Sequence, residues 1–172
     1  NCDVSRIAIL GFSAGGHLTA CLGTLWHMKE IYDAVDMPYG YNKPKAVMPI
    51  YPVITGDPKC SHKGSFQNLF GTDEPSKEQL DMVSLELHVD EKTCPVFLMH
   101  TSDDAVVPVE NSLRFANALA KAGHKFELHI YPSGPHGIAL ANPITSMGEP
   151  DHENPEIAKW VEMAAAWANS IQ

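Results

Sequence analysis

Basic side chains are scarce in this sequence of 172 residues. Twelve Lys and Arg stand against 21 Asp and Glu, which gives a formal net charge of −9 with the histidines neutral. Proteins hold the phosphates of nucleic acids with clustered Lys and Arg, and the sequence contains no such cluster. The composition therefore argues against a nucleic-acid-binding protein.

Long apolar runs are missing as well. No stretch reaches the roughly 18 consecutive apolar residues that a membrane-spanning helix needs. The first residues have neither the basic nor the apolar region of a secretory signal peptide, and there is no initiator methionine. We therefore expect no membrane partner, favour a cytoplasmic location, and expect further residues before Asn1 in the natural gene product.

Cysteine is sparse and unpaired in the sequence. The four cysteines are far apart and form no C-x-x-C pair, which argues against a zinc ribbon, a thioredoxin-type site or a disulfide scaffold. Buried or free thiols are expected instead. The nine histidines include no H-x-x-x-H pair with a glutamate, so we expect neither a metal nor another cofactor.

What the sequence does contain is an alternation of strand and helix patterns. Short apolar runs predict four strands, over residues 6–10, 46–51, 95–100 and 126–131. Apolar residues at helical spacing predict helices over 14–28, 108–122 and 155–171. This order predicts a single α/β domain over residues 1–172, with a mainly parallel sheet of about four strands and helices on both faces.

Residues 55–93 interrupt this alternation. The segment is polar and rich in Gly and Pro, with a possible short helix over 80–87. Long polar segments inside a compact domain are often functional, so we interpret 55–93 as a lid-like excursion. Its apolar residues Phe66, Leu69, Phe70 and Met82 could line an acyl pocket or form a small core beneath the loop.

A serine lies where the first predicted strand meets the first helix. The sequence Gly11-Phe12-Ser13-Ala14-Gly15 is a G-x-S-x-G motif, which holds a nucleophilic serine on a strained strand-to-helix turn. Side chains at the flanking glycines are expected to strike the adjoining strand and helix. The backbone N–H of Ala14, at the helix start, is expected to stabilise an oxyanion.

The other two groups that a catalytic serine needs follow the third and fourth strands. Asp103 and Asp104 are candidate carboxylates, and His136 lies in a loop between Pro135 and Gly137. Active sites of parallel sheets form at the carboxyl ends of the strands, so these loops should meet Ser13. The order Ser, Asp, His is that of α/β-hydrolases.

These motifs resemble those in the carboxyl-terminal half of α/β-hydrolase esterases, above all bacterial acetyl esterases and acetylxylan-esterase-like proteins (lipase/esterase or dienelactone-hydrolase-like). The resemblance rests on five segments in the family's order: residues 11–18, 51–54, 64–71, 100–112 and 134–137. It implies a serine ester hydrolase that acts on short acyl, especially acetyl, esters of sugars or xylan. The family's D-x-x-V-P pattern assigns the acid to Asp104 rather than Asp103.

The family also has an amino-terminal half that precedes the nucleophile, with further strands and an H-G-G-type loop that supplies a second oxyanion donor. Only twelve residues precede Ser13 here. Strand 6–10 should therefore present an uncovered apolar edge, to be covered by a missing amino-terminal half or by a second chain. Two alternatives stay open: a serine peptidase of the same fold, and a non-catalytic hydrolase fragment that acts as an assembly partner.

Overall fold

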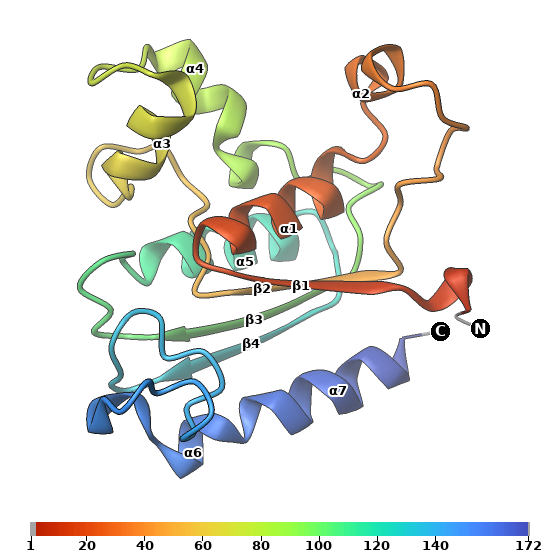
Figure 1. The fold of residues 1–172 in the computed structure, drawn as a ribbon. Coiled ribbons are helices and arrows are strands. Elements are labelled where there is room, and N and C mark those ends of the chain that lie inside the picture. The colour runs from red at the N-terminus through yellow and green to blue at the C-terminus, as the bar shows by residue number, and fades with distance from the viewer. Residues whose placement is uncertain (1–2, 172) are drawn as a thin grey trace.

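A four-stranded parallel sheet runs through the computed structural model, which describes residues 3–171 (Figure 1). The strands lie side by side in chain order: β1 (Ala8–Phe12), β2 (Ala46–Ile50), β3 (Val96–Thr101) and β4 (Phe126–Tyr131). All three pairings are parallel, so each strand is reached by a crossover from the one before. The predicted α/β architecture is confirmed.

Helices cover both faces of this sheet (Figure 1). On one face lie α1 (Ala14–Leu25) and α5 (Glu110–Lys121), and on the other lies α7 (Trp160–Ser170), preceded by the single turn α6 (Pro155–Ala158). Alternate residues of β3 serve the two faces: Leu98 packs in one core cluster and Phe97 in the other. A central strand buried on both faces explains why residues 96–99 are all apolar.

Several element boundaries differ from those predicted. The first strand runs over 8–12 rather than 6–10, so it ends inside the G-x-S-x-G motif, and α1 ends at Leu25 rather than at 28. The last predicted helix divides at Lys159 into α6 and α7. Four short elements were not predicted: α2 (Lys29–Ala34), α3 (Lys63–Phe70) and the 3-10 turns Val4–Arg6 and Pro150–His152.

The polar segment 55–93 contains two helices, α3 (Lys63–Phe70) and α4 (Lys77–Val83), and a 3-10 turn, Leu85–Leu87. The short helix predicted over 80–87 is present with other bounds. A capping box between Ser76 and Gln79 starts α4 earlier, and α4 ends before Ser84, after which residues 85–87 form the 3-10 turn. Phe66 packs in a small cluster with Val53 and Val107, whereas Leu69 and Met82 are exposed.

Asn111 joins this segment to α5. The side chain is fully buried, and its Oδ1 accepts hydrogen bonds from the backbone N–H groups of Ile54 (2.8 Å) and Thr55 (3.1 Å). Its Nδ2 donates to the carbonyl oxygens of Cys60 and Pro108, both at 2.9 Å. One side chain thus satisfies three backbone groups of the chain that leaves β2 and one just before α5.

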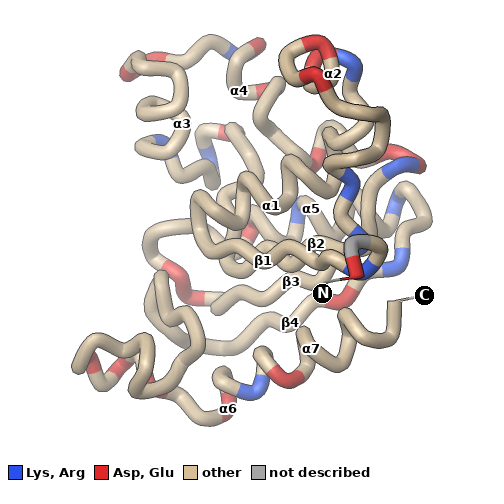
Figure 2. The backbone as a smooth tube through the Cα atoms, turned by 45° about the vertical axis from the view of Figure 1, so that its right-hand side comes forward, with Lys and Arg blue, Asp and Glu red and all other residues tan. Residues whose placement is uncertain are grey.

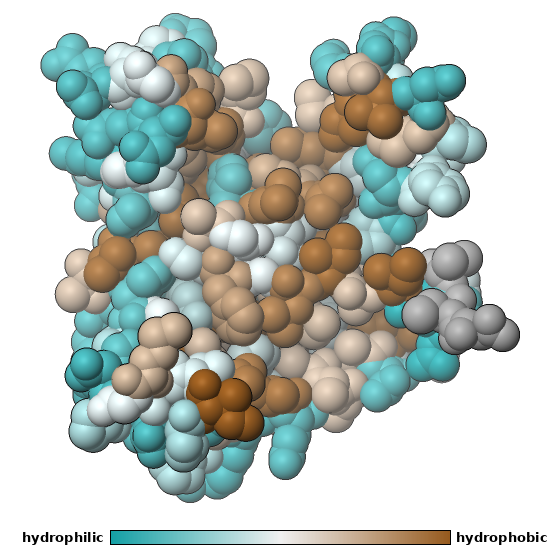
Figure 3. All heavy atoms as spheres, viewed as in Figure 1, coloured by the Kyte–Doolittle hydropathy of each residue, from teal (hydrophilic) through white to brown (hydrophobic). Residues whose placement is uncertain are grey.

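Strand β1 lies at the edge of the sheet. Within residues 3–171 it pairs with β2 alone, and Ile7 and Leu10 are 47% and 39% exposed. Figure 3 shows apolar side chains gathered on the face that lies over β1 and α1. The expected uncovered apolar edge is therefore present among the described residues.

The described residues include three of the four cysteines, Cys21, Cys60 and Cys94, and all three are free thiols. Cys2 lies outside the described residues. Over residues 3–171, no helix combines the length and apolar character needed to cross a membrane.

Candidate active site

Ser13 lies in the turn between β1 and α1 with φ 53° and ψ −117°. A positive φ is costly for a residue with a side chain, so neighbouring structure must hold it. The backbone N–H of Ser13 donates to the carbonyl of Ile50 (3.0 Å), and its carbonyl accepts from His17 (3.1 Å) and Val53 (3.2 Å). The expected strained turn is therefore anchored to the end of β2 and to the chain that follows it.

The glycines of this turn differ in their importance. A Cβ on Gly11 would lie 2.2 Å from the carbonyl oxygen of Gly15, so Gly11 is required, as predicted. A Cβ on Gly15 would meet nothing within 4 Å, so the same expectation for Gly15 is wrong. The second close approach occurs at Gly16, where a Cβ would lie 2.9 Å from Cβ of Pro52. The turn is therefore closely packed against its neighbours at Gly11 and Gly16, and not at Gly15.

Ser13, His136 and Asp104 form a chain of hydrogen bonds. Oγ of Ser13 lies 2.8 Å from Nε2 of His136, and Nδ1 of His136 lies 2.7 Å from Oδ2 of Asp104. An ionised carboxylate can only accept, so Nδ1 carries the proton and Nε2 of the neutral ring accepts from the Ser13 hydroxyl. Three loops far apart in sequence bring these groups together at the carboxyl ends of the strands.

The carboxylate of Asp104 is buried and fully bonded. Its side chain is 1% exposed, and Oδ1 accepts from the backbone N–H groups of Val106 and Val107, both at 2.9 Å. Burial alone would raise the pKa of Asp104, but hydrogen bonds from His100, His136 and the two backbone groups outweigh it. The pKa of Asp104 lies well below its usual range, so the group is ionised at neutral pH.

Asp103 has a different part in the structure. It is exposed, and its oxygens accept from the hydroxyl of Ser133 (2.6 Å) and the N–H of Gly134 (2.9 Å). These two bonds, the hydroxyl first, lower the pKa of Asp103. Figure 2 marks the acidic positions of this loop in red after β3. Asp104 is thus the carboxylate that contacts His136, and Asp103 joins the β3 loop to the loop that carries His136.

Ala14 is the first residue of α1, directly after Ser13. The first N–H groups of a helix have no partner within the helix, and the helix dipole favours negative charge there. The N–H of Ala14 is therefore a candidate donor to an anion that forms beside Ser13.

Tyr51 is a site residue that sequence reasoning missed. It has φ 35°, and its ring packs edge-on against the imidazole of His136 with a centroid distance of 5.1 Å. Its hydroxyl accepts from the N–H of Ala139 (3.2 Å), and burial raises the pKa of Tyr51 to about 12. The one available signal was its position as the last residue of a predicted strand, directly before Pro52.

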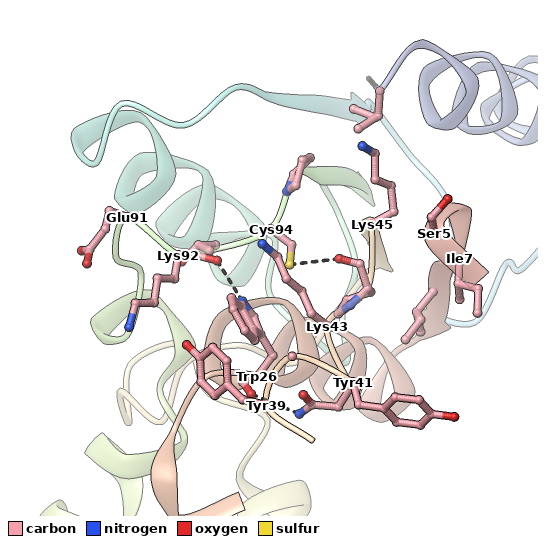
Figure 4. Close-up of a pocket in the computed structure, with 17 residues that line it drawn as sticks. Ser5, Ile7, Trp26, Tyr39, Tyr41, Lys43, Lys45, Glu91, Lys92 and Cys94 are labelled. Carbon is pink, nitrogen blue, oxygen red and sulfur yellow. Dashed lines mark hydrogen bonds between the residues drawn. The ribbon is translucent and has the colours of Figure 1, made fainter. Parts of the chain in front are cut away.

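Two hollows lie at opposite ends of the sheet. One of about 550 Å³ adjoins His136 and is bordered by polar side chains that include Asp103, Asp151 and Asn154. The other, of about 1060 Å³, lies where the chain enters the strands and contains Trp26, Tyr39 and Lys43 (Figure 4). Figure 2 also shows several Lys and Arg near the two termini at that end. Of the three hydrogen-bonded residues, His136 lines the first hollow.

Over residues 3–171, no three His, Cys, Asp or Glu side chains are grouped so as to bind a metal ion.

Comparison with known proteins gives consistent matches. The family model BD-FAE matches residues 1–119, which include Ser13 and Asp104. The chain is similar to endo-1,4-beta-xylanase B of Butyrivibrio fibrisolvens, with 38% identity over 83% of this chain and 22% of that protein. It is also similar to an acetylxylan esterase of Xylanibacter ruminicola, with 34% identity over 81% of this chain and 27% of that protein.

Among solved structures, the chain is similar to an acetyl ester-xyloside bifunctional hydrolase from Caldicellulosiruptor lactoaceticus, with a TM-score of 0.79 and 40% identity. That match covers 98% of this chain and 58% of the other. The chain thus spans about a quarter of the curated relatives and somewhat more than half of this solved structure.

Proposed function

The chain belongs to the BD-FAE family and has an α/β-hydrolase fold, and on that basis we propose that it is the nucleophile-bearing part of a serine ester hydrolase. The observation that carries this proposal is the hydrogen-bonded chain from buried Asp104 through His136 to the hydroxyl of Ser13. A serine hydroxyl is a weak nucleophile until a base accepts its proton, and this arrangement provides one.

The proposed reaction has two steps. His136 Nε2 accepts the Ser13 proton as Oγ bonds to the ester carbonyl carbon, and ionised Asp104 stabilises the imidazolium. His136 then returns that proton to the leaving alcohol as the ester C–O bond breaks. Water attacks the acyl-enzyme and gives a proton to His136, which passes it to Ser13 Oγ as the acid leaves.

The N–H of Ala14 is proposed as one donor to the oxyanion in both steps. In other serine hydrolases a single such donor contributes about 2.7–4 kcal/mol to transition-state stabilisation. A second donor is proposed to come from a segment outside this sequence. Its absence would slow turnover while leaving the nucleophile and base in position.

The proposed substrates are short-chain acyl esters, above all acetyl esters of xylan-related sugars. Support comes from the names of three similar proteins: a xylanase, an acetylxylan esterase and an acetyl ester-xyloside bifunctional hydrolase. The polar border of the hollow beside His136 is compatible with a hydroxylated leaving group. In this proposal the 55–93 segment forms a wall of the acyl pocket over Ser13.

We further propose that an upstream segment covers β1. The exposed apolar side chains Ile7 and Leu10, on or next to a strand with one free edge, support this proposal. The matched solved structure is considerably longer than this chain, which gives room for such a segment. The same segment would supply the second oxyanion donor.

The test is ester hydrolysis by the natural polypeptide that contains this chain. We expect nitrophenyl acetate to be hydrolysed faster than the octanoate, acetate to be released from acetylated xylan, and little action on the matching nitroanilides.

Ser13→Ala and His136→Ala should each remove nearly all activity, while Ser102→Ala, an exposed serine of the β3 loop, should not. Substantial activity in either of the first two variants would contradict the proposal. Preference for the octanoate would indicate a lipase, and preference for the anilide a peptidase.

A further inference from the structure

A second histidine faces the carboxylate of Asp104 from the side opposite to solvent. His100 lies near the end of β3, and its side chain is fully buried. Its Nε2 lies 3.0 Å from the carbonyl oxygen of Val107 and 3.4 Å from Oδ2 of Asp104. A buried imidazole with polar neighbours on both nitrogens is held in one orientation.

The neighbours of His100 determine which nitrogen carries the proton. Near Nε2 are a carbonyl oxygen and an ionised carboxylate oxygen, both of which can only accept, so Nε2 carries the hydrogen. Nδ1 lies 2.7 Å from Oγ of Ser112, a buried residue of α5. In the neutral ring Nδ1 therefore accepts from the Ser112 hydroxyl, and every polar atom of the imidazole has a partner.

Four N–H groups thus face one carboxylate. Oδ1 of Asp104 accepts from the backbone of Val106 and Val107, while Oδ2 faces the N–H groups of His136 and His100. Of the two contacts of Nε2, the one with the Val107 carbonyl is the shorter, so it also holds the residue whose N–H donates to Oδ1. His100 therefore acts on both oxygens of Asp104, one directly and one through the turn.

We propose that His100 is a positioning residue for the proposed triad: its Nε2–H fixes the 104–107 turn and keeps the Asp104 carboxylate aimed at Nδ1 of His136. This inference rests on the proposed function. His100 does not reach substrate, because it is buried behind Asp104, and α5 holds it there through Ser112.

The proposal predicts effects on turnover rather than on substrate binding. Asp104 matters most when His136 is positively charged, so an unaligned carboxylate lowers kcat and leaves KM nearly unchanged. A carboxylate that is no longer aimed at Nδ1 also stabilises the His136 imidazolium less. The acidic limb of the kcat/KM profile, set by His136, is therefore expected to move to lower pH.

The test compares His100→Phe, which removes the donor, with His100→Gln, whose amide N–H can occupy the position of Nε2–H. In the natural polypeptide, kcat for nitrophenyl acetate should fall about 10- to 100-fold in the Phe variant, the scale of a misplaced catalytic group. The Gln variant should keep most of the activity and the parent acidic limb. His129→Phe, a half-buried histidine on β4 that contacts Phe97, is the matched control and should resemble the parent.

Two NMR measurements test the proposal independently of activity. Nitrogen-15 shifts should show neutral His100 protonated at Nε2, and the titration midpoint of His136 should be lower in His100→Phe than in the parent. If His100→Phe folds and keeps the kcat and the His136 titration of the parent, the inference is overturned. A His100 that is protonated at Nδ1 in the parent would also overturn it, and this measurement decides the matter if the variant does not fold. A parent that hydrolyses no ester would overturn the proposed function instead.

Discussion

At the scale of single residues, the two adjacent aspartates have different contacts. One orients the proposed base, His136, and the other holds the loop that carries it. Asp104 contacts His136, whereas Asp103 binds Ser133 and Gly134. Asp104→Asn presents an amide to Nδ1 and favours the wrong tautomer of the imidazole, so kcat should fall by about 10⁴-fold. Asp103→Asn keeps an acceptor oxygen for the loop and should cost less than about 10-fold.

Steady-state kinetics of both variants with nitrophenyl acetate provide the measurement. The reverse ranking would assign the orienting carboxylate to Asp103 and contradict the geometry described above.

The depressed pKa of Asp104 has a consequence for acid stability. Its pKa in the folded protein lies below the value of about 3.9 expected in the unfolded chain. Its ionisation therefore contributes to the free energy of unfolding above about pH 4, and that contribution is lost as the pH falls further. When urea unfolding is compared at pH 6 and pH 3, the free energy of unfolding should fall less for Asp104→Asn than for the parent. Equal losses would mean that Asp104 is not stabilised in its ionised form.

The sequence indicated Ser13, Asp104 and His136 as candidates because each follows a recognisable strand and carries a reactive group. Tyr51 and His100 were missed for a physical reason. Their relation to the site depends on which way a side chain points at the end of a strand and on contacts with helix α5, and neither is encoded in a local pattern. The resemblance to esterases did include both positions, without indicating what they contact.

At the scale of elements, the strand-to-helix turn offers a matched pair of substitutions. Gly11→Ala would force a Cβ against the backbone of Gly15, and overpacking of this kind costs about 1–3 kcal/mol. Gly15→Ala meets open space at the start of α1 and should change the free energy of unfolding by less than about 1 kcal/mol. Denaturant unfolding of the two variants tests this order, and equal destabilisation would contradict it.

Strands were easier to predict than helix boundaries. All four strands are short runs of mostly apolar residues, largely buried in β2 and β3 and partly buried in β1 and β4, and the sequence located them to within about two residues. Helix α4 was misplaced because its start depends on the Ser76–Gln79 capping box, and α2 was missed because none of its residues is buried. In the 55–93 segment local hydrogen bonds, rather than apolar periodicity, determine where helices begin and end.

At the scale of the whole molecule, the free edge of β1 governs how the isolated chain should behave. An exposed strand edge with apolar side chains pairs with other chains. The 172 residues expressed alone should therefore self-associate and have little ester hydrolase activity. Analytical ultracentrifugation should show less association for Leu10→Lys, because a charge at the edge opposes pairing. A monomeric, fully active preparation of the unmodified chain would contradict the proposed upstream cover.

The central claim is that Ser13 is a nucleophile activated by His136. The most direct test is to react the natural polypeptide with a fluorophosphonate probe and to locate the adduct by mass spectrometry. We predict one stoichiometric adduct, on Ser13, that forms much more slowly in His136→Ala. An enzyme that hydrolyses esters while Ser13 stays unlabelled, or that is labelled at another residue, would contradict the account.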